Sequence, residues 1–183
     1  MPEPVSKSRA VILVGFMGAG KTSVGRALGS LLQWPFEDLD DRIVIREGRA
    51  IEQIFGESGE AEFRLAEHAA LRELISELGG SPRVVALGGG AFAEPENQAL
   101  IRQAGLAAVF LDGSAEELYE RCRQGEQVER PLRRDLEQFR RLYEARRPHY
   151  LKAIMRIETA GKDVETVAEE VASKLGLRGA DKQ

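Results

Sequence analysis

Gly15-Phe-Met-Gly-Ala-Gly20-Lys21-Thr22 is the stretch that decides the fold of this 183-residue chain. It fits the pattern G-x-x-x-x-G-K-[ST], in which backbone N–H groups wrap phosphate oxygens and the lysine reaches the β- and γ-phosphates. The glycines permit close approach, and the following helix start adds partial positive charge. The segment therefore predicts a nucleoside triphosphate site, with the Thr22 hydroxyl as a Mg²⁺ ligand. The residues expected to contact the nucleotide are Gly18, Ala19, Gly20, Lys21, Thr22 and Ser23.

The flanks of this stretch predict a strand before it and a helix after it. Residues 11–14 form a continuous apolar run, typical of a buried parallel strand, and a helix is expected over about 21–32. Strands alternate with helices along the rest of the chain, which predicts one three-layer α/β domain with ligands at the carboxyl ends of its strands. The other expected strands are 36–39, 84–87, 107–111 and 154–157. The other expected helices are 41–55 with a break near Gly48, a longer one from Ser58, one from Ser114, and 164–175.

The longer helix carries a charged residue on its apolar face. Ser58 is the expected N-cap. Leu71 belongs to an apolar stripe, and Arg64 lies two turns before it, so Arg64 is expected to point toward the protein. The alternative is a surface ion pair between Glu60 and Arg64, four residues apart. The pattern alone leaves both open.

Asp38-Leu39-Asp40 closes the second predicted strand. Residues two apart on a strand project to the same face, so both carboxylates are expected beside the phosphate loop. One would orient Mg²⁺ and its waters, and the other would accept the proton of an attacking hydroxyl. Acids at a strand-to-helix junction are also common helix caps. The ligand role is favoured because no later apolar strand is read as ending in aspartate; residues 84–87 run into Gly88-Gly89-Gly90 instead.

Three later segments are also expected at a ligand site. Gly88-Gly89-Gly90 exposes bare backbone at the end of a core strand, although a mobile turn is the alternative. Residues 124–132, which include Arg130, suit a lid that closes over phosphates. Arg146-Arg147-Pro148 is expected to end a helix, because proline pushes the preceding residue out of helical geometry, which places an arginine at that end.

Composition limits the remaining possibilities. The 26 basic and 30 acidic residues argue against a general nucleic-acid binder. The excess of arginine between Arg121 and Arg147 suggests a small anionic ligand. The alternative, for about half of these arginines, is a solvated helical face with interspersed glutamates. Cys122 is the single cysteine and is read as structurally incidental in a reducing compartment. No apolar run approaches the roughly 20 residues of a membrane span, and the first nine residues lack a signal-like apolar region, so a cytoplasmic protein is expected.

These motifs, in this order, resemble the shikimate kinase family over about residues 11–172. The matching segments are Gly15–Thr22, Asp38-Leu-Asp40, Gly59-Glu-Ala-Glu-Phe-Arg64, Gly88-Gly-Gly90, Arg130-Pro131-Leu132 and Arg146-Arg-Pro-His-Tyr150. The resemblance implies a P-loop kinase fold with a five-stranded parallel sheet in the order 2-3-1-4-5, helices on both faces and a lid. It also implies phosphorylation of the 3-hydroxyl of shikimate by ATP, in the pathway to chorismate and aromatic amino acids.

The resemblance further implies roles for single residues. Asp40 would hold the acceptor hydroxyl and act as base, Asp38 would support one Mg²⁺ ion per subunit through water, and Lys21 would act on the phosphates. The residues implied at the acceptor are Asp40, Arg64, Gly89, Gly90 and Arg146. Arg130 would be the lid arginine, and Arg123 would lie against the adenine. The family's adenine-facing loop near 159–163 is matched loosely, and Lys162 is not assigned there. A monomer spanning residues 1–183, with a tail from about 177, completes the expectation.

Two rival interpretations remain at this stage. One is another kinase of the same fold, such as a gluconate or nucleoside monophosphate kinase, against which the Gly-Glu-x-x-Phe-Arg and Gly-Gly-Gly segments weigh. The other is a nucleotide-dependent regulatory module without catalysis, which would be expected to lose at least one of Lys21, Asp40 and Arg130. All three are present in this chain.

Overall fold

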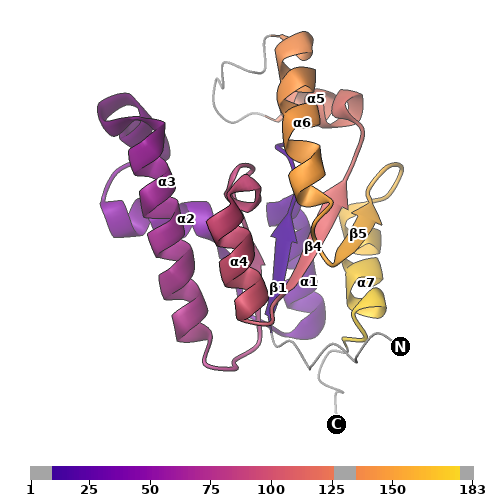
Figure 1. Cartoon of the computed structure of the whole chain (residues 1–183). Helices are drawn as coiled ribbons and strands as arrows, with labels where there is room; N and C mark the ends of the chain where they lie inside the picture. Colours follow the sequence, from indigo (N-terminus) through magenta and orange to yellow (C-terminus); the bar gives the residue numbers. More distant parts are fainter. Residues whose placement is uncertain (1–9, 126–134, 178–183) are drawn as a thin grey trace.

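A five-stranded parallel sheet in the order β2-β3-β1-β4-β5 forms the centre of the protein (Figure 1). The computed structural model describes residues 10–125 and 135–177. The strands are β1 (Ala10–Val14), β2 (Phe36–Asp38), β3 (Arg83–Ala86), β4 (Ala107–Asp112) and β5 (Met155–Glu158). The strand order that the family resemblance implies is therefore confirmed.

The central strands are buried because helices cover both of their faces. Every residue of β1 and β4 is buried, as expected for apolar runs inside a parallel sheet. Leu13 of β1 pairs with Ala86 of β3 on one side and with Val109 of β4 on the other. This register brings the carboxyl ends of the three central strands together at one edge of the sheet.

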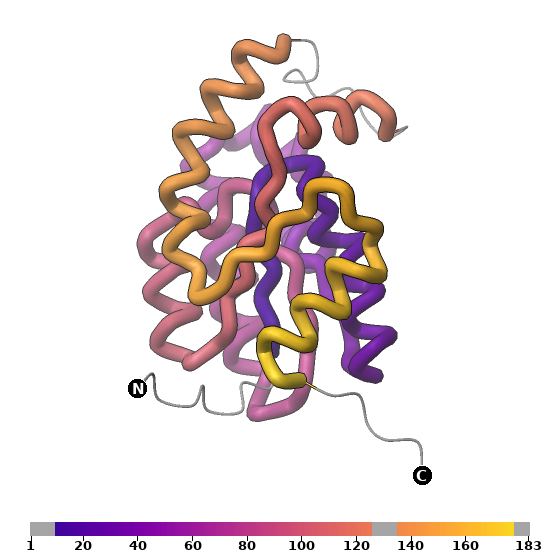
Figure 2. Tube along the Cα trace, turned by 90° about the vertical axis from the view of Figure 1, so that its right-hand side faces the viewer, coloured from indigo at the N-terminus to yellow at the C-terminus, as the bar shows by residue number. Residues whose placement is uncertain are grey.

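Helices form a layer on each side of the sheet. Figure 2, which views the sheet nearly edge-on, shows α4 and α6 on one side and α1 and α7 on the other. The helices are α1 (Lys21–Leu32), α2 (Leu39–Glu47), α3 (Ile51–Leu78), α4 (Pro95–Gln103), α5 (Ala115–Gln124), α6 (Leu136–Tyr150), α7 (Val164–Lys174) and the short 3-10 helix η1 (Ala91–Ala93). The sequence pattern does not predict η1 or α4, because only Asn97 and Ile101 of α4 are buried and they make no apolar stripe.

The expected break near Gly48 is present, and a second interruption lies next to Ser58. Gly48 ends α2 in the left-handed conformation, with a φ of 66°. The chain is helical again from Ile51, which agrees with the helix expected over 41–55. Gly59, with a φ of 83° and a ψ of 175°, then kinks α3, so its long second part begins one residue after Ser58. Among the described residues, the expected N-cap bond of Ser58 is not seen; its hydroxyl accepts a hydrogen bond from Arg49.

Pro148 does not end its helix, which corrects a second expectation. The helix α6 continues to Tyr150, and the N–H of Leu151 still bonds to the carbonyl of Arg147 at 3.1 Å. Proline removes one intrahelical hydrogen bond, and so close to the end few bonds remain for it to disturb. Arg146 is therefore in the last turns of α6 rather than at a helix end set by the proline.

None of the helices in the described parts of the chain is both long and apolar enough to cross a membrane.

Candidate active site

The phosphate loop joins β1 to α1 and is shaped by its glycines. Gly18 and Gly20 have φ values of 81° and 86°, a region that side chains other than glycine rarely adopt. A Cβ atom at Gly18 would also lie 2.5 Å from the carbonyl oxygen of Leu118. The ammonium of Lys21 donates to the carbonyls of Gly15 and Phe16 at 2.8 and 2.9 Å, which holds it across the loop.

Thr22 and Asp38 form a pair beside this loop. The Thr22 hydroxyl donates to Oδ2 of Asp38 at 2.8 Å. The other oxygen, Oδ1, accepts from the backbone N–H of Asp40 at 3.0 Å, so Asp38 is the N-cap of α2. The sequence allowed two roles for Asp38, a helix cap and a support for Mg²⁺. Its geometry agrees with both, because it caps α2 and presents an oxygen next to Thr22.

Asp38 and Asp40 do not project from one strand face. The strand β2 ends at Asp38, and Asp40 lies in the first turn of α2. The alternation argument was wrong here because the strand is one residue shorter than expected. Asp40 nevertheless reaches the site, since its Oδ1 is 2.7 Å from the position that a Cβ atom on Gly88 would occupy.

Each glycine of Gly88-Gly89-Gly90 lies next to a different charged side chain, and at Gly88 and Gly90 a larger residue would collide with it. A Cβ on Gly88 would meet the Asp40 carboxylate. A Cβ on Gly89 would lie 3.6 Å from Nη1 of Arg146, and one on Gly90 would lie 2.8 Å from Nη1 of Arg64. Side chains from three helices, α2, α6 and α3, therefore meet at this turn, at the carboxyl end of β3.

Glu67 lies behind Arg64 and is a site residue that the sequence analysis did not name. It is 1% exposed and accepts from Nη1 of Arg64 at 2.7 Å. Burial, helped by the nearby charges of Asp40 and Glu94, raises the pKa of Glu67 to about 7 against the opposing effect of Arg64. A sequence signal was available, because Glu67 precedes the buried Leu71 by four residues and so lies on the apolar face of α3.

The Arg64 side chain lies near three carboxylates. Besides Glu67, its Nη2 lies 3.5 Å from Glu60 and its Nε lies 3.6 Å from Glu94. Within the described residues, the buried Nε of Arg64 has no hydrogen-bond partner. Both sequence readings of Arg64 thus hold in part, because the side chain turns inward and also lies near Glu60.

Arg146 and Tyr150 come from the last turns of α6. The Arg146 guanidinium lies 5.8 Å from the centre of the Phe16 ring, within cation–π range. The Tyr150 hydroxyl donates to the carbonyl of Gly89. Burial raises the pKa of Tyr150 to about 12, so its hydroxyl remains a donor at neutral pH.

One cavity of about 770 Å³ connects these parts. The phosphate loop forms its middle. Asp40, Gly88, Gly89 and Arg146 line one part of the wall, and Arg121, Thr159, Lys162 and Asp163 line another. Arg64 and Gly90 do not line this cavity; the Arg64 guanidinium lies against Gly90, the residue after Gly89.

Arg121, and not Arg123, lines the cavity from α5. Arg121 donates to the hydroxyl and the carbonyl of Thr159 at 3.5 and 3.4 Å. Arg123 is largely exposed and lies 3.6 Å from Glu120, one turn earlier in the same helix. Arg130 and residues 126–132 of the expected lid lie outside the described residues, as do residues 178–183 of the expected tail.

An apolar strand does end in aspartate, which corrects the sequence analysis. The strand β4 reads Ala-Ala-Val-Phe-Leu-Asp and ends at Asp112. Asp112 does not line the cavity; its carboxylate pairs with Arg147 and Arg156. The acids that face the phosphate loop are therefore still Asp38 and Asp40.

Comparison with known proteins gives one consistent result. Residues 17–176 match the family model described as shikimate kinase. The shikimate kinase of Geobacter sulfurreducens is 45% identical over 171 residues, covering 92% of this chain and 91% of the relative. That of Thermus thermophilus is 43% identical, with 90% and 89% covered. The solved shikimate kinase of Acinetobacter baumannii in complex with shikimate is 34% identical, with a TM-score of 0.80 and 92% and 93% of the two chains covered.

Proposed function

Because this chain belongs to the shikimate kinase family, we propose that it moves the γ-phosphate of ATP onto the 3-hydroxyl of shikimate, releasing ADP. The chain is a phosphotransferase, and the product, shikimate 3-phosphate, leads toward chorismate and the aromatic amino acids. The observation that carries the proposal is the cavity itself. It joins a phosphate loop to an acid, Asp40, beside the glycine turn on which Arg64 and Arg146 lie.

Shikimate carries one carboxylate and three hydroxyl groups, and the glycine turn offers matching partners. Arg146 reaches the cavity at Gly89, and Arg64 lies against Gly90 with its Nε free of hydrogen bonds within the described residues. Guanidinium groups bind carboxylates through paired charge-assisted hydrogen bonds. We assign the acceptor carboxylate to Arg64 and Arg146, with a backbone contact from Gly89 or Gly90.

Asp40 is assigned to the attacking hydroxyl. It lines the cavity between the phosphate loop and Gly88. A carboxylate in this place accepts the proton of the acceptor hydroxyl as its oxygen attacks the γ-phosphorus and the bond to the ADP oxygen breaks. Lys21 and Arg130 neutralise charge on the transferred phosphoryl group, and Arg130 is assigned to a lid over residues 124–132.

Mg²⁺ fits the oxygen pair beside the phosphate loop. The Thr22 hydroxyl and an Asp38 oxygen lie 2.8 Å apart, and hard oxygen ligands are those that Mg²⁺ prefers. Thr22 would bind one ion directly, and Asp38 would hold it through water. When bound with ATP, the ion neutralises charge on the β- and γ-phosphates.

The remaining part of the cavity is assigned to the nucleoside. Arg121, Thr159 and Lys162 line it, and Arg123 lies two residues after Arg121 on α5. We assign adenine contact to this end, with Arg123 lying against the base. We further propose that residues 1–183 act as one cytoplasmic domain and that the protein is a monomer.

The test is ADP release with ATP, Mg²⁺ and a panel of acceptors. We expect turnover with shikimate and none above background with gluconate or a nucleoside monophosphate. Mass spectrometry should identify the product as shikimate 3-phosphate. Turnover with gluconate at a comparable rate would favour a different kinase of this fold. ADP binding without turnover of any acceptor would favour the regulatory module.

A further inference from the structure

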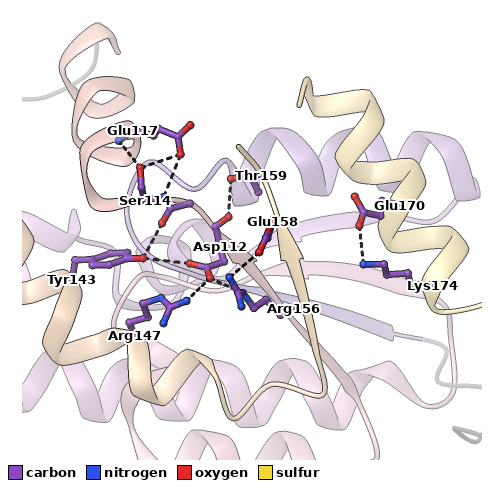
Figure 3. A network of polar contacts seen from close by, with 11 residues as sticks. Asp112, Ser114, Glu117, Tyr143, Arg147, Arg156, Glu158, Thr159, Glu170 and Lys174 are labelled. Carbon is purple, nitrogen blue, oxygen red and sulfur yellow. Dashed lines mark hydrogen bonds and ion pairs between the residues drawn. The ribbon is translucent and has the colours of Figure 1, made fainter. Parts of the chain in front are cut away.

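Asp112 is a buried acid at the end of β4 to which the proposed function gives no role (Figure 3). It is 5% exposed. Its Oδ2 accepts from Nη2 of Arg147 at 2.8 Å and lies 2.7 Å from Nε of Arg156. The Tyr143 hydroxyl lies 3.4 Å from Oδ1 and donates to the carbonyl of Gly113 at 2.9 Å. One carboxylate thus joins β4 to α6 and to β5.

The bond from α6 constrains the rotation of that helix. Arg146 and Arg147 are consecutive, so their side chains leave α6 about 100° apart. Arg147 points to Asp112, while Arg146 points to Gly89 and the Phe16 ring. A rotation of α6 that released Arg147 would also carry Arg146 away from the cavity.

The last turn of α6 depends on such side-chain bonds. Pro148 has no N–H, so the carbonyl of Glu144 receives no bond from it. Earlier in α6, the Tyr143 hydroxyl also donates to the carbonyl of Gly113. In the last turn, the side-chain bonds to other elements within the described residues are Arg147 to Asp112 of β4 and Tyr150 to the carbonyl of Gly89 in the turn after β3. Of these two, only the bond from Arg147 to Asp112 joins two side chains, so substitution of either residue removes it.

We propose that Asp112 is a positioning residue, which acts through Arg147 to fix the rotation of α6 and so hold Arg146 at the acceptor end of the cavity. The inference rests on the proposed assignment of Arg146 to the acceptor carboxylate. Neither Asp112 nor Arg147 is part of the described cavity wall, so both act on the acceptor through Arg146.

Arg156 provides a matched control. It makes the same kind of ion pair with the same oxygen of Asp112, but it belongs to β5 and not to α6. If the two arginines served only to neutralise the buried charge of Asp112, removing Arg147 and removing Arg156 should have similar effects on acceptor binding. If it positions α6, only loss of Arg147 should alter acceptor binding.

The experiment is a steady-state comparison of the full chain with Arg147→Gln and Arg156→Gln. In Arg147→Gln we expect KM for shikimate to rise roughly three- to tenfold, because the acceptor loses part of a charge-assisted bond, with kcat and KM for ATP changed less than about twofold. Arg156→Gln should change all three constants less than about twofold. Arg147→Lys, which keeps the charge, should recover most of the loss.

Two further variants complete the design. Asp112→Asn should raise KM for shikimate as Arg147→Gln does, and the double variant should show no additional increase. Arg146→Lys tests the premise, and KM for shikimate should rise in it as well. Thermal melting of every variant reports its stability, so that a folding defect is recognised separately from a change in KM.

Each outcome supports or overturns the inference. A rise of KM in Arg147→Gln but not in Arg156→Gln supports it, whether or not Asp112→Asn folds. Equal effects in the two variants, or none in either, overturn it. If Arg146→Lys raises KM and Arg147→Gln does not, only the positioning role fails. If Arg146→Lys leaves KM unchanged, the proposed role of Arg146 fails and the inference fails with it.

Discussion

Asp38 and Asp40 are two residues apart but have different neighbours, which makes them separable by substitution. Asp40 faces Gly88, whereas Asp38 accepts from Thr22. In Asp40→Asn we expect turnover to fall about 10²–10⁴-fold with ATP binding nearly unchanged, because general-base assistance is lost. Asp38→Asn should be partly rescued by added Mg²⁺, because support of the metal is weakened instead.

The measurement is turnover of both variants across a Mg²⁺ titration at saturating ATP and shikimate. Thr22→Ser serves as a control that keeps the hydroxyl beside Asp38. Rescue of Asp40→Asn by Mg²⁺, without rescue of Asp38→Asn, would mean that the two assignments are reversed.

Glu67 gives the protein a specific dependence of stability on pH. Burial holds a proton on this carboxyl up to a pH of about 7 in the folded state, whereas an ordinary glutamate loses it near 4.5. Because the pKa of Glu67 is higher in the folded than in the unfolded state, its protonation stabilises the fold, and this stabilisation is complete at a pH below the unfolded-state pKa. Between the unfolded-state and the folded-state pKa, the stabilisation falls by about 1.4 kcal/mol per pH unit as the pH rises.

In Glu67→Gln this loss should be absent, because an amide does not ionise. The neighbouring Arg64, Asp40 and Glu94 are the same in both proteins, so the difference isolates Glu67. Urea unfolding at about pH 5 and about pH 7.5 should show the wild type losing roughly 2 kcal/mol more than the variant between the two conditions. Parallel losses in the two proteins would show that Glu67 has no raised pKa.

At the scale of elements, the turn after β3 depends on the absence of side chains. Gly90 has a φ of −102°, which alanine adopts without strain. Its Cβ would nevertheless lie 2.8 Å from Nη1 of Arg64, so the guanidinium must move. In Gly90→Ala we expect KM for shikimate to rise roughly tenfold, with KM for ATP little changed, because Arg64 is displaced.

Gly56→Ala is the control for this prediction. Gly56 lies in α3, and a Cβ there meets nothing within 4 Å. The variant should keep its kinetic constants and gain about 0.5–1 kcal/mol of stability, since alanine is the better helix former. An unchanged KM for shikimate in Gly90→Ala would remove Arg64 from the acceptor site.

The elements also show where sequence patterns mislead. The proline rule predicted the end of a helix at Pro148, but the effect of a missing N–H is small one turn before a helix end. The serine preference at N-caps suggested that Ser58 caps the longer helix, but the chain breaks one residue later, at Gly59, because glycine adopts the positive φ of the kink without strain. In both cases a local rule placed the feature within a few residues of its true position but not at the residue that the structure uses.

At the scale of the whole molecule, the cavity shared by the phosphate loop and the acceptor end predicts cooperation between ligands. The phosphate loop and the acceptor end share one space of about 770 Å³. We expect ADP and shikimate together to raise Tm by more than the sum of their separate effects, because each ligand orders residues of the cavity wall that the other ligand also contacts. Thermal shift measurements with each ligand alone and with both would check this.

Gluconate is a matched control, since it also carries a carboxylate and several hydroxyl groups. It should not act synergistically with ADP. A Tm shift from shikimate that is independent of ADP would indicate two uncoupled sites, and an equal response to gluconate would indicate that the acceptor end recognises only a carboxylate.

The sequence by itself determined the fold class, the phosphate loop and the family. The apolar runs of β1 and β4 predict buried strands, and the residues from Gly15 to Thr22, between a predicted strand and a predicted helix, fit a phosphate loop, so these signals are local. For Arg64 the register of the apolar stripe gave only one of two open readings, and the side chain both turns inward to Glu67 and lies near Glu60.

Only the tertiary structure decided which side chains meet. Glu67 lies behind Arg64, Arg121 and not Arg123 lines the cavity, and Asp112 pairs with two arginines from later elements. These contacts join residues from separate elements, and the position of each element depends on how the helices rotate and pack on the sheet. Periodicity fixes the face that a helix buries, but the partner opposite that face is set by long-range packing, which no local pattern encodes.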